Sequence, residues 1–182
     1  EWGLGYDTLF ALSIPMSVLF GAAALPAGWM GDKWSASGMM ALFFFGVGLG
    51  SIATGLADTP LTICLGLAVI GLFGAIYHPV GIPWLVRNAV NRGRALGING
   101  VFGSIGTAAA ALVAGFLADL YGWRAAFIVP GVICLITGLA FLWARQTDRL
   151  LDRGEDAVPT PPPGKSDIWR VFWVMSATML CT

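Results

Sequence analysis

The stretch "LPAGWMGDKWSASG", residues 25 to 38, places an aspartate and a lysine side by side between two long apolar runs. Such a charged corner is unusual in a soluble core, where charged side chains are almost never fully buried without a partner. Two apolar runs that a short polar corner joins are typical of consecutive transmembrane helices. If the corner joins two transmembrane helices, other apolar runs of similar length are expected along the chain.

The composition favours a membrane protein. Of the 182 residues, 57% are hydrophobic and only 11% are charged, whereas about a quarter are charged in an average soluble domain. The mean hydropathy is +0.79. A net charge of zero gives no support for a nucleic-acid partner. The three cysteines are far apart and have no metal-ligand spacing, so we expect them to be small apolar side chains.

Five apolar segments are long enough to cross a bilayer, which takes about 20 mainly apolar residues per helix. We expect them at residues 5–30, 37–57, 60–86, 95–118 and 123–144. The alternative, a set of buried soluble helices, leaves too little chain to cover them. Because backbone groups in lipid must bond internally, we predict an all-α polytopic transmembrane helical bundle.

One segment, residues 145–167, is long and polar and contains a proline run, which is typical of a solvated linker. We predict a transmembrane bundle at residues 1–146, an interdomain linker at 147–167 and the start of a second bundle at 168–182. On this interpretation the chain is a fragment of a longer protein.

Local signals mark two of the helix starts. Ser35 or Ser37 is placed to cap the second segment, because a hydroxyl can accept a bond from a free N–H in the first turn. Asp58 or Thr59 is placed to cap the third segment. Pro60 then falls at the first helical position, where its missing N–H costs nothing.

The ten Lys and Arg residues predict an orientation. Nine lie in or beside the odd-numbered connections between segments: Lys33, Arg87, Arg92, Arg94, Arg145, Arg149, Arg153, Lys165 and Arg170. Only Arg124 lies in an even-numbered connection. The positive-inside rule makes the odd-numbered connections and the linker cytoplasmic, in a cell inner (plasma) membrane.

A short repeat supports this arrangement. "AGWMGD" at 27–32 and "AGFLAD" at 114–119 both read AGxxxD at the end of a helix, and they fall on opposite sides of the predicted membrane. A repeated unit of opposite orientation is common in secondary transporters. We expect Asp119, the counterpart of Asp32, at the outer surface and paired with Arg124.

The corner resembles the cytoplasmic loop signature of the major facilitator superfamily, GxxxD(R/K)xG(R/K)(R/K). Gly28, Asp32 and Lys33 match it, whereas residues 35–37 lack its glycine and its basic pair. The resemblance implies a cytoplasmic latch between the two halves of a transporter, in which Asp32 holds an arginine or a helix end. Arg87 is the local partner that we expect. The alternative is a solvated polar turn.

The resemblance extends over nearly the whole chain. "YGWRAAF" at 121–127 is similar to the family's entry into its sixth helix, and residues 92–115 are similar to its fifth helix. The chain would then supply helices two to six and the start of helix seven. The resemblance implies secondary active transport of a small solute by alternating access, with protons as the expected coupling ion.

The only histidine, His78, lies well inside the third segment, next to Pro79 and before Pro83. The prolines each remove a backbone hydrogen bond and should bend the helix. An ionisable residue inside a membrane indicates a functional site, and histidine changes charge near neutral pH. We therefore predict that His78, Tyr77 and Asn99 face the cavity. The alternative is a neutral His78 that bonds a carbonyl freed by the prolines.

Four glycines, Gly97, Gly100, Gly103 and Gly106, recur every three residues on the fourth segment. Small residues on one strip permit close helix packing, so we predict a tight contact there. A phosphate-binding loop is excluded, because the strip lacks a lysine and follows no strand. The Gly-Pro pair of the family's antiporters is absent from Ala108–Ala111.

No residue pattern predicts catalysis, a metal site or a cofactor, so we do not expect an enzyme. The expected partners are membrane lipid, a small solute and the missing helices of the same polypeptide. The alternative function is that of a non-transporting member of the fold: a scaffold, an assembly factor or a subunit of a larger membrane complex. A transporter should line its cavity with polar groups, whereas a scaffold should close it with apolar ones.

Overall fold

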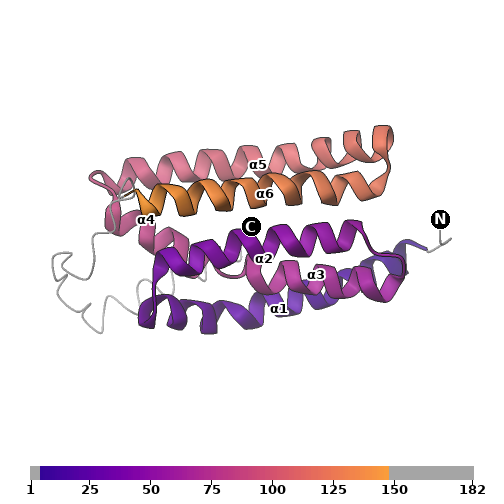
Figure 1. The fold of residues 1–182 in the computed structure, drawn as a ribbon, viewed down its shortest axis with the longest axis horizontal. Helices are drawn as coiled ribbons and strands as arrows, with labels where there is room; N and C mark the ends of the chain where they lie inside the picture. The colour runs from indigo at the N-terminus through magenta and orange to yellow at the C-terminus, as the bar shows by residue number, and fades with distance from the viewer. Residues whose placement is uncertain (1–4, 148–182) are drawn as a thin grey trace, which may run out of the picture. The chain divides into compact units, whose positions relative to one another are not determined.

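The computed structural model describes residues 5–147, which all lie in one unit, residues 1–152. The predicted linker beyond Thr147 and the predicted start of a second bundle lie outside the described residues. Within them every regular element is a helix (Figure 1). The elements are α1 (Tyr6–Lys33), α2 (Ala36–Gly55), α3 (Pro60–Gly74), the π-helical turn η1 (Tyr77–Gly81), α4 (Ile82–Asn88), α5 (Arg92–Tyr121) and α6 (Trp123–Gln146).

Five helical segments are long and apolar enough to cross a membrane, as the sequence predicts. The third of them, Pro60–Asn88, consists of α3, η1 and α4. The fourth is longer than expected, because Asn91 caps α5 by accepting a bond from the Arg94 N–H at 3.0 Å. It ends at Gly122, whose φ of +88° is open to glycine but strained for other residues.

The caps settle the open choices at two helix starts. Ser35, not Ser37, caps α2, and its hydroxyl accepts from the Gly38 N–H at 3.1 Å. Thr59, not Asp58, caps α3 in a reciprocal capping box with Thr62. Pro60 takes the first position of α3, as predicted.

The centre of the bundle is α2, which packs against α6 on one side and α3 on the other (Figure 1). Glycines allow the close approach to α6: a Cβ placed on Gly131 would lie 2.9 Å from the Gly48 carbonyl oxygen. The Ser51 hydroxyl donates to the Phe127 carbonyl at 2.7 Å across the same seam. Small residues and interhelical hydrogen bonds of this kind hold helices together in lipid.

The third span changes partners along its length. Its first part, α3, packs against α1 and α2, whereas α4 packs against α5. Between them the ladder shifts to a π-turn, in which the Ile82 N–H bonds the Tyr77 carbonyl. Pro79 and Pro83 lie in or beside this turn and carry no N–H, so the helix changes type where the prolines are expected to bend it, and the bend itself stays a prediction.

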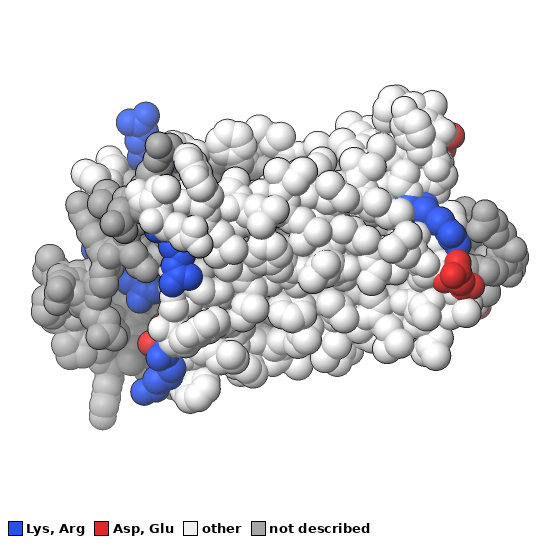
Figure 2. Space-filling model, viewed as in Figure 1, with Lys and Arg blue, Asp and Glu red and all other residues white. Residues whose placement is uncertain are grey.

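The charged side chains lie at the two ends of the described bundle (Figure 2). The C-terminal ends of α1, α4 and α6 lie at one end of the described bundle, and Lys33, Arg87, Arg92, Arg94 and Arg145 lie in or beside them. The remaining described cation, Arg124, lies at the other end. This distribution is the one from which we predict a cytoplasmic basic end.

The expected pairing of Arg124 with Asp119 is wrong. Arg124 donates instead to Asp58 at 3.1 Å and to the Ala57 carbonyl at 3.2 Å. The reason is the α2–α6 seam, which brings the start of α6 against the end of α2: a Cβ on Gly55 would lie 2.9 Å from the Arg124 carbonyl oxygen. Asp119 is exposed on α5 and makes no ion pair within the described part of the chain.

Candidate functional site

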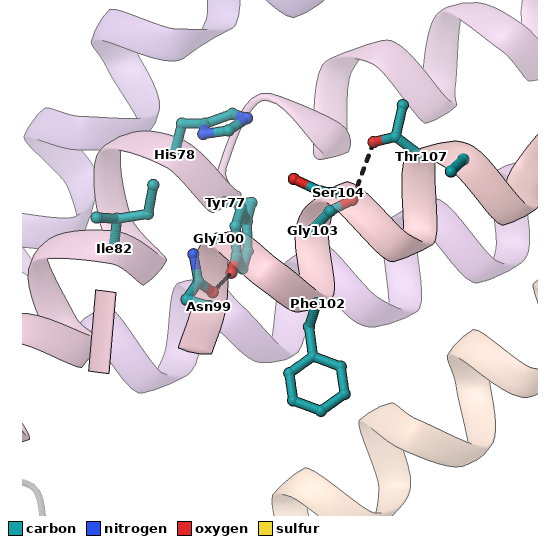
Figure 3. A pocket seen from close by; sticks show the side chains of 10 residues that line it. Tyr77, His78, Ile82, Asn99, Gly100, Phe102, Gly103, Ser104 and Thr107 are labelled. Carbon is teal, nitrogen blue, oxygen red and sulfur yellow. Dashed lines mark hydrogen bonds between the residues drawn. The ribbon is translucent and has the colours of Figure 1, made fainter. Parts of the chain in front are cut away.

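The three residues that we expect at a cavity line one pocket of about 870 Å³. Tyr77 and His78 come from η1, and Asn99 comes from α5 (Figure 3). The other lining residues are Ile82, Gly100, Phe102, Gly103, Ser104, Thr107 and Ala108. The break in the third span creates this site, because it carries the chain from α1 and α2 across to α5.

The two walls of the pocket are joined by a hydrogen bond, in which the Tyr77 hydroxyl donates to Asn99 Oδ1 (Figure 3). The Phe43 ring of α2 packs behind the Tyr77 ring, with centroids 5.7 Å apart. This bond leaves the Asn99 amide N–H groups as donors and the Tyr77 oxygen as an acceptor. The pair therefore offers a solute both hydrogen-bonding functions at a fixed position.

His78 is exposed at the pocket and contacts two aromatic rings. Its ring lies edge-on to Tyr77 at 5.5 Å and to Phe20 of α1 at 6.3 Å, measured between centroids. The alternative interpretation requires a hydrogen bond from the His78 side chain to a backbone carbonyl. Within residues 5–147 the side chain makes no such bond. Neither ring nitrogen is thus held by a hydrogen bond within the described residues, and a neutral imidazole offers a solute one N–H donor and one nitrogen acceptor.

Ser104 and Thr107 also line the pocket, although the sequence analysis does not name them. The Thr107 hydroxyl donates to the Gly103 carbonyl at 3.0 Å, which leaves its oxygen as an acceptor. Asn99, Gly103 and Thr107 recur every four residues and therefore share one helix face. That spacing of polar and small residues, in an otherwise apolar helix, was the available signal.

The expected tight packing of the α5 glycines is not found among the described residues. Nothing lies within 4 Å of a Cβ placed on any of Gly97, Gly100, Gly103 or Gly106. Within this part of the chain α5 packs mainly against α6 and α4, and two of the four glycines line the pocket instead. Any close contact along this strip must come from outside residues 5–147.

The expected latch residues lie at the basic end of the bundle. Asp32, Lys33 and Arg87 are all exposed, and no ion pair joins Asp32 to Arg87 in the described residues. Gly28 lies close to η1: a Cβ placed on it would lie 3.3 Å from the Pro79 Cβ. The local Arg87 partner is therefore not found, and the latch itself stays a prediction.

Several curated proteins resemble this chain. It is 30% identical over 136 residues to the puromycin resistance protein pur8 of Streptomyces alboniger, an alignment that covers 73% of this chain and 26% of that protein. It is 26% identical over 141 residues to the riboflavin transporter RibZ of Clostridioides difficile, covering 74% and 29%. It is 28% identical over 153 residues to a probable hexose phosphate transport protein of Chlamydia muridarum, covering 82% and 32%.

The chain thus spans about a third or less of the length of the curated relatives it matches. No solved structure matches it. Residues 4–182 match the sequence model of one family, described as Major Facilitator Superfamily. Five membrane-length helices, a pocket with several polar side chains between two of them and a family match over nearly the whole sequence agree: the chain belongs to the Major Facilitator Superfamily.

Proposed function

We propose that this chain forms part of a secondary active transporter, and that the pocket between η1 and α5 supplies one half of its solute site. The observation that carries the proposal is the convergence of Tyr77, His78 and Asn99 from two helices onto one pocket. A membrane scaffold should close such a pocket with apolar side chains, whereas this pocket presents a phenol, an amide and an imidazole. The names of the relatives, a resistance protein and transport proteins, support the same proposal.

The chemistry of the pocket defines the solute class. Its described wall offers a phenol, an amide, two hydroxyls and an imidazole beside the Phe102 ring, and no Lys, Arg, Asp or Glu. Uncharged donors and acceptors beside aromatic faces suit a ring-containing solute with several polar groups. A strongly anionic solute would need its cation from His78 or from the rest of the protein.

Proton coupling is assigned to His78. His78 is the only histidine of the chain and lines the pocket, and histidine commonly serves as a proton carrier in proteins. Protonation would add a donor to the pocket and alter the affinity for a solute there. Alternating access would then expose this pocket to one side of the membrane at a time, with the latch at Asp32 closing the basic end.

The test is uptake by the full-length protein in proteoliposomes, with labelled riboflavin, puromycin and glucose 6-phosphate as probes. Thr107→Ala should raise the apparent KM of a transported probe about fivefold, since one hydrogen bond is worth about 1 kcal/mol. Thr137→Ala on α6 is the matched control, because that exposed hydroxyl makes the same intrahelical bond, to Ile133, outside the pocket. Equal effects of the two variants would contradict the assignment of the pocket.

A further inference from the structure

The π-turn η1 has two faces with different neighbours. Tyr77 and His78 face the pocket with Asn99. Pro79 and Val80 pack against α1, and Val80 is only 3% exposed. One short turn therefore stands between the pocket and α1.

The contact with α1 depends on two glycines. A Cβ placed on Gly31 would lie 2.8 and 3.1 Å from the two methyl groups of Val80, and the shorter distance is closer than real contacts allow. A Cβ on Gly28 would lie 3.3 Å from the Pro79 Cβ, which is tight but tolerable after a small shift. The observed approach of η1 to α1 therefore requires glycine at position 31 and is eased by glycine at position 28.

The backbone ladder of the turn gives it little support of its own. Pro79 donates no backbone hydrogen bond, and π-turns are rare single turns that occur mostly at functional sites. On its other side Gly81 packs on Met40 of α2, where a Cβ would lie 2.9 Å from the sulfur. The location of η1 is thus set by contacts with α1 and α2 more than by its own backbone ladder.

We propose that Gly28 and Gly31 are positioning residues for the pocket: they seat η1 against α1 and so fix Tyr77 and His78 opposite Asn99. Asp32 is the next residue after Gly31, so the same contact links the pocket to the charged corner of α1. A shift of that corner moves η1, and by reciprocity a solute held at η1 biases the corner. This inference rests on the proposed function for its meaning in transport, but the positioning itself is measurable without transport.

The size of the effect follows from the distances. Carbon atoms in contact lie about 3.5–4.0 Å apart, so Gly31→Ala must displace η1 by about 1 Å. Val80 cannot yield by rotation, because a β-branched side chain is stiff at χ1 and this one is buried. Gly28→Ala requires η1 to move by only a few tenths of an ångström. Gly21→Ala on the same helix requires no movement, since nothing lies within 4 Å of its Cβ.

The experiment uses the full-length protein with its native cysteines replaced and a reporter introduced by Ser104→Cys in the pocket. The rate of labelling by N-ethylmaleimide is measured in detergent for Gly21→Ala, Gly28→Ala and Gly31→Ala. We expect no change, a change of up to about threefold, and a change of about three- to tenfold, in that order. Val80→Ala added to Gly31→Ala removes the clashing methyls and should return the rate to within about twofold of the parent.

A Gly31→Ala protein with a lower unfolding temperature but an unchanged labelling rate overturns the proposal, as does failure of Val80→Ala to restore an altered rate. If Gly31→Ala does not fold, Gly28→Ala and the double variant carry the same test. Probe uptake is measured in parallel in proteoliposomes. An ordered labelling series without uptake of any probe would refute the transport assignment while leaving the positioning role intact.

Discussion

The seam between α2 and α6 gives the most direct test of the packing, through Gly131→Ala. The new methyl would lie 2.9 Å from the Gly48 carbonyl oxygen and 3.1 Å from the Ile52 amide nitrogen, both backbone atoms. Ordinary contacts begin at 3.4 Å, so the helices must separate locally by about 0.5 Å. Overpacking of this kind costs about 1–3 kcal/mol.

Two smaller terms adjust that magnitude. Alanine has a higher helix propensity than glycine by about 1 kcal/mol, which offsets part of the loss. The Ser51–Phe127 hydrogen bond, one turn from Gly131, starts at 2.7 Å and survives a lengthening of about 0.5 Å. The net expectation is a destabilisation of up to about 2 kcal/mol relative to the parent, and of about 1–3 kcal/mol relative to a glycine-to-alanine variant that gains the same propensity without a close contact. The loss arises from the backbone contact and not from the hydrogen bond.

The assay is the midpoint of thermal unfolding of the full-length protein in dodecyl maltoside, followed by tryptophan fluorescence. At about 2–4 °C per kcal/mol, the unfolding midpoint of Gly131→Ala should lie several degrees below that of a glycine-to-alanine control. Gly115→Ala on α5 is the control, because nothing lies within 4 Å of its Cβ in the described residues. If Gly131→Ala unfolds at the same temperature as Gly115→Ala or higher, the close α2–α6 contact is wrong.

Four further outcomes follow from the described residues. Arg124→Gln should destabilise the protein by less than about 1 kcal/mol, because its partner Asp58 is 84% exposed. Asp119→Asn should leave the unfolding midpoint unchanged. A lower midpoint for Asp119→Asn than for Arg124→Gln would support the Asp119–Arg124 pair after all. His78→Ala should abolish proton-linked uptake of a transported probe and leave folding intact, as circular dichroism would show, whereas retained coupling would make His78 structural. Asp32→Asn should shift the pattern of cysteine accessibility toward the inward-open state, and an unchanged pattern would reduce Asp32 to a turn residue.

Local features of this fold were predictable from the sequence. The five spans depend on the length of apolar runs, and the caps at Ser35 and Thr59 depend on residues within one turn of the helix start. The choice between Ser35 and Ser37 stayed open because both hydroxyls precede an apolar run. Only the backbone shows that Ser37 already lies inside the helix and is buried.

Contacts between distant segments were not predictable in the same way. The sequence repeat pointed to Asp119 as the partner of Arg124, but the partner depends on which helix lies beside the start of α6. That neighbour is α2, and a single sequence does not indicate it. Likewise, the regular spacing of the α5 glycines led to the prediction of a tight contact on α5. The close contact between α2 and α6 instead involves Gly48 and Gly131, which share no short motif.

The candidate pocket lies between these two cases. His78 and Tyr77 were recognisable because polar and ionisable residues beside prolines are rare in an apolar span. Asn99 was placed near the cavity, but its hydrogen bond to Tyr77 joins residues 22 positions apart and depends on the path of the third span. Ser104 and Thr107 gave a weaker signal, because single hydroxyls are common in transmembrane helices.

The two copies of the AGxxxD repeat show how a shared motif acquires different roles. Both lie near the C-terminal ends of long helices, α1 and α5, at opposite ends of the described bundle. In the first copy Gly28 lies against Pro79 of η1, whereas in the second nothing lies within 4 Å of a Cβ on Gly115. The motif therefore specifies a helix end with a small residue one turn before an aspartate, and the neighbouring element decides what that small residue does. The neighbour is η1, the π-turn that carries two pocket residues, only at the first copy. The corner at residues 25–38 is therefore the better candidate for a link between the predicted latch and the pocket.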